Sequence, residues 1–204
     1  MEGTDPVNKK LTAALSGGAV LVVAALSGCS SKDSGPDPKL VAWAKTVCDA
    51  VPAQDMKIKA ANAAIAETAA DTTNPPGTIQ KTDSKAFQDM ADGYKALATA
   101  ISNAGAPPGV DGGAKRQQDV VRNLNSLSSS YADLKKKVDA LNTKDQGKFA
   151  KGLHDVASQM TELETKNKSG TEALKNLEQG DVKDAIAQQP SCKKVASTAS
   201  ATTG

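Results

Sequence analysis

The sequence predicts an all-α protein, an antiparallel bundle of four long helices followed by a short C-terminal helical segment. Apolar residues recur at spacings of three and four over long stretches, which is the pattern of amphipathic helices. No segment alternates β-branched or aromatic residues with polar ones over a useful length, so no strand is expected. Alanine, which favours helix and lets backbones approach, is abundant in the first two helices.

The first two helices have clear boundary signals. Asp37-Pro38 is a start signal, with aspartate as N-cap and proline at the first helical position. Pro52 is expected to kink or restart the first helix, which should end before Asn74-Pro75-Pro76-Gly77. The second helix is expected to begin around residues 82–83 and to close within 105–109. The apolar positions of the two helices are Leu40, Val41, Ala44, Val47, Cys48, Val51, Ile58, Ala61, Ile65 and Ala69, then Phe87, Met90, Tyr94, Leu97 and Ile101.

The third helix, expected over 115–141, has the most regular pattern. Its apolar positions alternate four and three residues: Val120, Leu124, Leu127, Tyr131, Leu134, Val138 and Leu141. This heptad spacing implies left-handed packing against neighbouring helices. Thr143-Lys144-Asp145-Gln146 has the form of a capping box, and the fourth helix continues with Phe149, Leu153, Val156, Met160 and Leu163. The short connection predicts an antiparallel hairpin. Gly93 and Gly152 lie inside predicted helices and mark either close helix contacts or points of fraying.

The ends of the folded region are also predicted. After Ser169-Gly170, two short helices are expected, one around 174–177 and one around 182–186. Residues 38–192 are long enough for one core, so a single helical domain is expected. Residues 29–37 are polar and form a flexible tether, and the eight residues after Cys29 reach about 25 Å when extended. Residues 193–204 are rich in Ser, Thr, Ala and Gly and are expected to be disordered.

Near the N-terminus, Leu26-Ser27-Gly28-Cys29 follows an apolar segment over 11–25 that is preceded by Lys9 and Lys10. This arrangement resembles the signal of bacterial lipoproteins. The resemblance implies that residues 1–28 are a cleaved signal peptide and that Cys29 carries a diacylglyceryl group, with further acylation such as palmitate. It also implies an exported protein held by lipid on the extracytoplasmic face of the cell membrane. The alternative is an uncleaved transmembrane anchor, which Ser16, Gly17 and Gly18 within the apolar segment weaken.

The chain has three cysteines, and an odd number in an exported protein needs an explanation. Lipidation of Cys29 leaves Cys48 and Cys192 as a pair in a compartment where disulfides persist. We expect these two to be bonded, which would attach the C-terminal segment to the first helix. A reactive or metal-binding thiol pair is the alternative, but it lacks a Cys-x-x-Cys spacing and a nearby histidine.

Charge and side-chain chemistry exclude several function classes. The formal net charge is +2, and removing residues 1–28 leaves it unchanged, so a nucleic-acid binder is not expected. His154 is the single histidine, which excludes a multi-histidine metal site and leaves no motif for a catalytic triad. Glu162 and Glu164 are two apart on a helix and point to different faces. No catalytic residues, metal or cofactor are predicted, and the protein is not expected to be an enzyme.

The aromatic residues Phe87, Tyr94, Tyr131 and Phe149 lie on or near apolar stripes and are expected in the core. Trp43 lies one position off its stripe, near the paired cysteines. It either covers the disulfide or stays exposed as a contact anchor for a partner.

The lipoprotein signal, the alanine-rich composition, the segment Trp43-Ala-Lys-Thr-Val-Cys48 and the late Cys192 resemble the small secreted lipoproteins of actinobacteria, of the Streptomyces type. That family supplies no activity to carry over, and only the lipidated cysteine transfers, onto Cys29. The leading hypothesis is a non-enzymatic cell-surface module that binds an envelope protein or cell-wall component. The alternative is a small-ligand carrier or sensor with a cavity between its helices.

Overall fold

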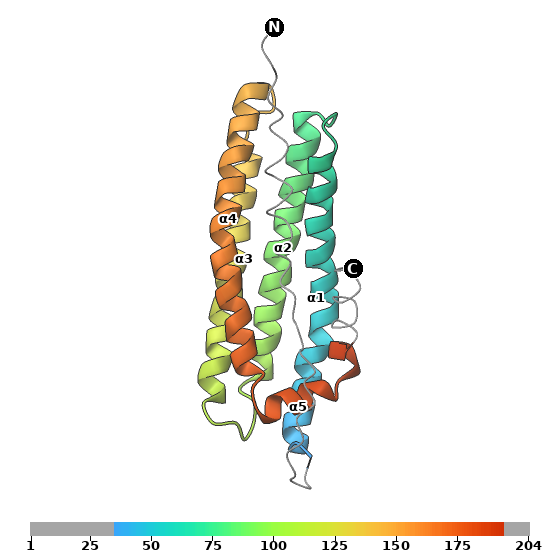
Figure 1. Cartoon of the computed structure of the whole chain (residues 1–204), viewed down its shortest axis with the longest axis vertical. Helices are drawn as coiled ribbons and strands as arrows, with labels where there is room; N and C mark the ends of the chain where they lie inside the picture. Colours follow the sequence, from blue (N-terminus) through green and yellow to red (C-terminus); the bar gives the residue numbers. More distant parts are fainter. Residues whose placement is uncertain (1–34, 194–204) are drawn as a thin grey trace.

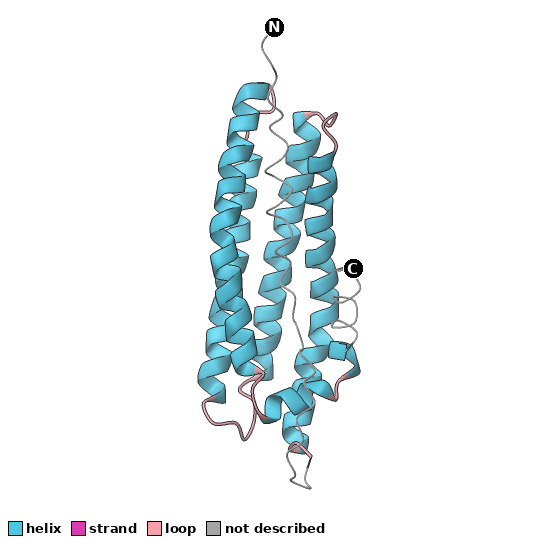
Figure 2. Cartoon of the chain, in the orientation of Figure 1, coloured by secondary structure: helices cyan, strands magenta, loops and turns pink. Residues whose placement is uncertain are grey.

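A computed structural model of the chain describes residues 35–193 and shows five helices (Figures 1 and 2). They are α1 (Pro38–Ala70), α2 (Pro76–Ala104), α3 (Gly113–Asp139), α4 (Gln146–Leu177) and α5 (Asp181–Ala187). One further helical turn covers 190–193, and no strand occurs in the described range. The prediction of four long helices with a short C-terminal helical segment is therefore confirmed.

The long helices pack in the order in which they follow one another along the chain. α2 lies between α1 and α3, and α3 lies between α2 and α4, while the short α5 crosses the base of the bundle and packs on α1 (Figure 1). α1 and α4 do not form a comparable contact with each other. We call the side of the bundle on which these two helices face each other the α1–α4 seam.

α1 begins where the sequence predicts. The side chain of Asp37 accepts a hydrogen bond of 2.7 Å from the backbone N–H of Lys39, and Pro38 occupies the first turn, where a missing N–H costs nothing. The helix then continues through Pro52 over 33 residues. Proline removes one backbone hydrogen bond there, but Val51 and Ile58 on either side of it are both buried, so core packing holds the segment in one helix.

α2 starts at Pro76, nearly two turns earlier than predicted, so the expected start at residues 82–83 is wrong. Two successive prolines indicate a break when considered alone, but Pro76 fits the first turn of a helix. The Pro75 carbonyl accepts bonds from the N–H groups of Thr78 and Ile79, at 2.9 and 3.3 Å. The segment Pro75-Pro76 is therefore the N-terminus of α2.

α4 is continuous from Gln146 to Leu177, so the expected break at Ser169-Gly170 is also wrong. The Ser169 hydroxyl donates to the Thr165 carbonyl, one turn back, at 3.3 Å. Gly170 is buried against α3, where an added Cβ would lie 3.4 Å from Leu127 Cδ1. Gly170 therefore lies where α4 packs on α3, at a distance at which an added Cβ would make an ordinary van der Waals contact. The later prediction of a short helix around 182–186 is confirmed by α5.

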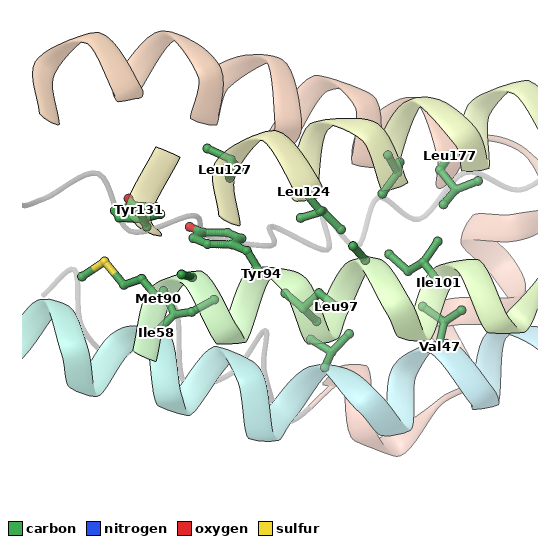
Figure 3. Close-up of a cluster of buried hydrophobic side chains, with 14 of the residues drawn as sticks. Val47, Ile58, Met90, Tyr94, Leu97, Ile101, Leu124, Leu127, Tyr131 and Leu177 are labelled. Carbon is green, nitrogen blue, oxygen red and sulfur yellow. The ribbon is translucent and has the colours of Figure 1, made fainter. Parts of the chain in front are cut away.

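The middle of the core is built around stacked aromatic rings from α2 and α3 (Figure 3). The ring centroids of Tyr94 and Tyr131 are 5.5 Å apart and nearly parallel, and those of Phe87 and Tyr131 are 6.3 Å apart. The heptad positions predicted for α3 are buried from Val120 to Val138, and Leu141 beyond the helix is half-buried. The predicted seam of α3 therefore forms the centre of the bundle.

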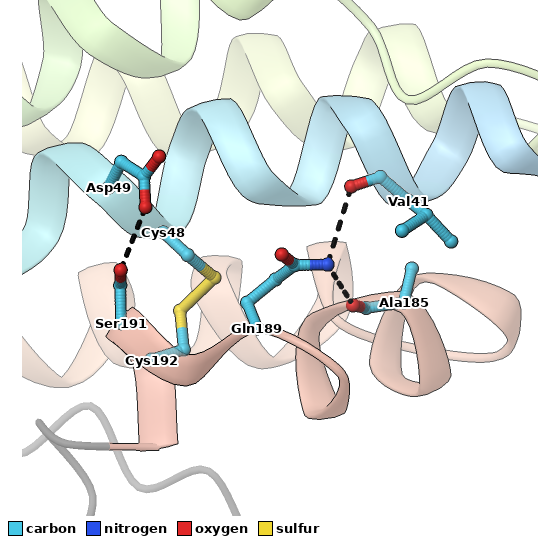
Figure 4. Close-up of a disulfide and its surroundings, with 7 residues drawn as sticks. All are labelled: Val41, Cys48, Asp49, Ala185, Gln189, Ser191 and Cys192. Atoms are coloured by element: carbon cyan, nitrogen blue, oxygen red, sulfur yellow. Dashed lines mark hydrogen bonds between the residues drawn. A yellow bond between two sulfur atoms is a disulfide. The ribbon is translucent and has the colours of Figure 1, made fainter.

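The C-terminal segment is attached to α1 by a disulfide between Cys48 and Cys192, as the cysteine count predicts (Figure 4). Two hydrogen bonds accompany it. The Ser191 hydroxyl donates to the Asp49 carboxylate at 2.7 Å, and the buried Gln189 amide donates to the Val41 carbonyl at 3.4 Å. α5 and the disulfide thus hold the chain end against the first turns of α1.

Gly93 marks a close approach between α1 and α2. A Cβ added there would lie 2.8 Å from Cγ1 of Ile58, which is closer than carbon atoms pack. Gly93→Ala should lower the free energy of unfolding by about 1 to 2 kcal/mol, because overpacking costs about 1 to 3 kcal/mol and alanine returns up to about 1 kcal/mol of helix propensity.

The measurement is urea denaturation followed by circular dichroism, with Gly77→Ala as the matched control in the same helix. A Cβ at Gly77 meets no atom within 4 Å, so that variant should be at least as stable as the parent protein. Equal stability of the two variants would show that Ile58 moves aside at no cost.

Candidate functional site

The predicted site residues fall into two groups. Leu26, Ser27, Gly28 and Cys29 lie outside the described residues, as do the signal segment and most of the tether. Trp43 is described and is buried at 5% exposure, with its indole Nε1–H donating to the Gly105 carbonyl at 2.9 Å. The prediction of Trp43 as an exposed contact anchor is therefore wrong, because the indole is buried and holds the C-terminal end of α2 against α1.

The described residues form an apolar pocket in the α1–α4 seam, at about mid-height of the bundle. We call it the seam pocket. All four long helices line it, with Asp55 and Ile58 from α1, Tyr94 and Leu97 from α2, Leu124 and Leu127 from α3, and Asn167, Gly170, Thr171 and Leu174 from α4. Five of these side chains, those of Ile58, Tyr94, Leu97, Leu124 and Leu127, are labelled in Figure 3. Its volume is about 40 Å³.

The walls of the seam pocket are aliphatic and its polar atoms are few. Ile58, Leu97, Leu124 and Leu127 are all buried in the core. An apolar cavity of this kind stays dry and takes apolar occupants. Glycine at position 170 contributes to the space, since a larger residue would project toward Leu127.

Three polar side chains stand at the sides of the pocket. The Asp55 carboxylate accepts an ion pair from Lys59 Nζ at 2.8 Å, and its side chain is 11% exposed. The Thr171 hydroxyl donates to the Asn167 carbonyl at 2.9 Å. The side-chain Oδ1 of Asn167 is buried and accepts no hydrogen bond from the described residues. The polar part of the pocket therefore offers mainly acceptors.

Both tyrosines beside the pocket stay protonated. Burial raises the pKa of Tyr94, and the neighbouring Tyr131 and Asp55 raise it further. Burial also raises the pKa of Tyr131, against smaller opposing effects of Asn167 and Tyr94. Neither phenol is poised to lose a proton near neutral pH, so the tyrosines act here as packing surfaces with neutral hydroxyls.

A second hollow is polar and lies on the outer face of α2 and α3, lined by Gln80, Lys81, Ser84, Lys85, Gln88, Lys135 and Asp139. Several of its groups are already engaged in hydrogen bonds or ion pairs. Lys135 pairs with Asp139 at 2.5 Å, and this contact and a bond from Ser84 lower the pKa of Asp139. The Gln80 amide donates to three carbonyls at the end of α3, those of Val138, Asp139 and Leu141. The Gln80 amide therefore satisfies carbonyl groups at the C-terminus of α3.

Other candidate chemistry is not assembled in residues 35–193. His154 is exposed on α4. Across the described residues, no group of three or more His, Cys, Asp or Glu side chains is placed to hold a metal ion. Within the same range, none of the helices combines the length and apolarity needed to cross a membrane.

The seam pocket was missed in the sequence, although a signal for it exists. The spacing of four and three that starts at Phe149 runs on past Leu163 through Asn167, Gly170 and Leu174. An asparagine and a glycine at such positions mark a polar and a small side chain facing a core. A helix that ends at Ser169-Gly170, as the sequence predicts, does not carry this spacing on to Gly170 and Leu174.

Comparisons with known proteins add no relative: no protein-family model matches this chain, and neither the curated proteins nor the solved structures contain a match.

Proposed function

We propose that this protein is a lipid-anchored, non-enzymatic binding module on the extracytoplasmic face of the cell membrane, and that it binds its partner through the α1–α4 seam. The observation that carries this proposal is the seam pocket, an apolar recess bordered by all four helices on the side where the bundle does not close. Recesses with apolar walls and a few polar groups are preferred contact sites.

The position of the anchor supports this assignment. The lipid on Cys29 would be joined to α1 by residues 30–37, which reach about 25 Å. The pocket residue Asp55 lies about 26 Å along α1 from Pro38, at 1.5 Å per residue. The pocket is therefore held within a few nanometres of the membrane, where it meets other membrane-associated proteins.

The pocket volume favours a contact site over a carrier. Sites for enclosed small ligands have volumes of about 300 to 1,000 Å³, whereas the seam pocket has about 40 Å³. A space of this size accommodates a single side chain of a partner. Two of the polar side chains already have partners, Asp55 in an ion pair and Thr171 in a hydrogen bond to the backbone. A side chain of a partner can therefore enter without having to satisfy them.

Crosslinking in living cells tests the proposal, with captured proteins identified by mass spectrometry. We expect a reproducible partner that is captured by the parent chain and lost with Cys29→Ala, because that variant would not be held at the membrane. If no partner is captured while the bait is recovered in full, the binding function is wrong. If Cys29→Ala still partitions with membranes at unchanged apparent mass, the lipid anchor is wrong.

A further inference from the structure

We infer that the polar hollow on the outer face of α2 and α3 binds a phosphate group, carried by a molecule outside the membrane. The inference goes beyond the proposed function, because the consecutive packing of the four long helices places the α2–α3 side opposite the α1–α4 seam (Figure 1). It is drawn from the volume of the hollow, the three lysines that line it and its distance from the start of α1.

The hollow has the size of a ligand site. Its volume is about 460 Å³, within the range of about 300 to 1,000 Å³ that is usual for sites that bind small molecules. It lies in the groove between two helices and is lined by Gln80, Ser84 and Gln88 of α2 and by Lys135 and Asp139 of α3, among others. Every lining side chain ends in a polar or charged group, which favours a polar occupant.

The lining carries an excess of positive charge. Lys81, Lys85 and Lys135 line the hollow together with a single carboxylate, that of Asp139, so the formal charge of the lining is +2. Both oxygens of this carboxylate have partners, since Oδ1 accepts from the Ser84 hydroxyl and Oδ2 from Lys135, each at 2.5 Å. Asp139 therefore repels an incoming anion less than an unpaired carboxylate would.

The lysines keep donors for a ligand. Lys81 is exposed and takes no part in the ion pairs found among residues 35–193. Lys85 pairs with Asp89, which is not part of the lining, and Lys135 also has one ion pair. An ammonium group has three N–H donors, so both retain donors. The Lys135 side chain is 30% exposed, and its packing and ion pair hold it at the hollow before a ligand binds.

These donors suit a tetrahedral dianion. Lysine binds phosphate as a point charge, whereas a planar carboxylate is matched best by the two-pronged guanidinium of arginine. The described residues that line the hollow include no arginine. A phosphate monoester carries a charge of about −1.5 to −2 at neutral pH, which balances a lining of +2. A phosphate group therefore fits both the charge of the hollow and the type of its donors.

The hollow lies far from the start of α1, where the expected anchor is attached. Gly93 of α2 packs on Ile58, which is about 30 Å along α1 from Pro38 at 1.5 Å per residue. α2 runs in the opposite direction (Figure 1), so Ser84 lies about 14 Å farther from the level of Pro38. At about 44 Å from the anchored end, the hollow meets molecules outside the membrane rather than lipid headgroups.

Titration of the purified, ¹⁵N-labelled full chain with inorganic phosphate at neutral pH tests the site, with ¹H–¹⁵N NMR as the readout. We expect saturable shifts of the amide signals of residues 80–88 and 135–139. Acetate at the same ionic strength is the reference anion and should not produce them. The phosphate shifts should disappear in about 1 M sodium chloride, where charges are screened beyond about 3 Å.

Two variants measure the contribution of the lysines. Lys81→Gln should raise the Kd for phosphate by about threefold to fivefold, the upper range for one exposed ion contact. Lys81→Gln combined with Lys135→Gln removes two of the three positive charges and should raise the Kd by about tenfold or more. The amide spectrum itself shows whether each variant keeps the fold.

Lys57→Gln is the matched control. Lys57 is exposed on α1 and, like Lys81, lies outside the ion pairs found in the described part of the chain. Its substitution removes the same charge far from the hollow and should leave the Kd for phosphate unchanged.

Vesicles test the source of the phosphate group. The full chain with Cys29→Ala is mixed with phosphatidylcholine vesicles that either contain or lack phosphatidic acid. We expect the amide signals of 80–88 and 135–139 to be the same in both. A response of these signals to phosphatidic acid alone overturns the assignment to a molecule outside the membrane. The site itself is overturned if phosphate gives no saturable shifts, if acetate gives the same ones, or if the double variant binds as tightly as the parent chain.

Discussion

Replacing Cys48 and Cys192 together by alanine should lower the free energy of unfolding by about 2 to 5 kcal/mol. The bridge closes a loop with a sequence separation of 144 residues. In the chain-entropy account, a crosslink across a loop this long removes about 5 kcal/mol of denatured-state entropy, and native bridges contribute about 2 to 5 kcal/mol. The expected loss is large because the bridged loop is long.

The loss should be concentrated at α5. α5 packs on α1, and hydrogen bonds from Gln189 and Ser191 to α1 reinforce this contact. Without the disulfide, α5 should open separately from the rest of the bundle, since local opening follows local contacts. Hydrogen exchange should therefore accelerate in 181–193 and remain slow in α2 and α3.

The control for this experiment is Ser191→Ala, which removes the 2.7 Å bond to Asp49 and leaves the bridge in place. Because that bond is exposed, its loss should cost about 1 kcal/mol or less. Urea denaturation of the parent protein with and without reductant gives the same comparison without substitution. If reduction leaves both the stability and the exchange of 181–193 unchanged, the disulfide does not hold this segment.

Asp83→Asn should stabilise the protein by an amount that grows as the pH rises. Asp83 is 8% exposed on α2, and burial raises the pKa of its carboxyl from 3.8 to about 7. Between these values the folded protein holds the proton that the unfolded chain has released, so stability falls with increasing pH. The slope is at most about 1.4 kcal/mol per pH unit.

Asparagine does not titrate, so the variant does not lose this stability as the pH rises. The difference in free energy of unfolding should be small near pH 4, should increase up to about pH 7 and should then stay constant at a value on the order of 4 kcal/mol. Urea denaturation at a series of pH values measures it. Glu178, whose pKa burial also raises to about 7, affects both proteins equally and drops out of the difference.

Asp133→Asn is the control for the pH series. Asp133 is exposed on α3 and pairs with Lys136 at 3.0 Å, and such surface pairs contribute about 1 kcal/mol or less. Its substitution should produce no comparable rise in stability between pH 4 and 7. A flat difference for Asp83→Asn would show that this carboxylate stays hydrated in the folded protein.

Much of the fold was predictable because the helical signal is local. The heptad spacing of α3 placed its core positions from Val120 to Val138, and all of those apolar residues are buried. The start of α1 at Asp37-Pro38 followed from capping chemistry that acts over a few residues. The pairing of Cys48 with Cys192 follows from the cysteine count, because the expected lipidation of Cys29 leaves two of the three cysteines.

The two errors have different causes: proline in a first helical turn is a local start signal, whereas at Ser169-Gly170 tertiary contacts override a local breaker signal. Pro75-Pro76 and Ser169-Gly170 both indicate helix ends in isolation. In the folded chain Pro76 lies in the first turn of α2, and Gly170 packs on Leu127. The burial of neighbouring residues outweighs the modest helix penalty of glycine and serine.

The sequence alone therefore predicts the class of fold and the buried faces of the helices, because both depend on residues a few positions apart. It also predicts the pairing of the cysteines, because that depends on their number. The seam pocket depends on something else. Its lining comes from four helices, and it exists because α1 and α4 do not close against each other. How far two non-consecutive helices stand apart follows from the packing of every helix between them, which no local pattern encodes.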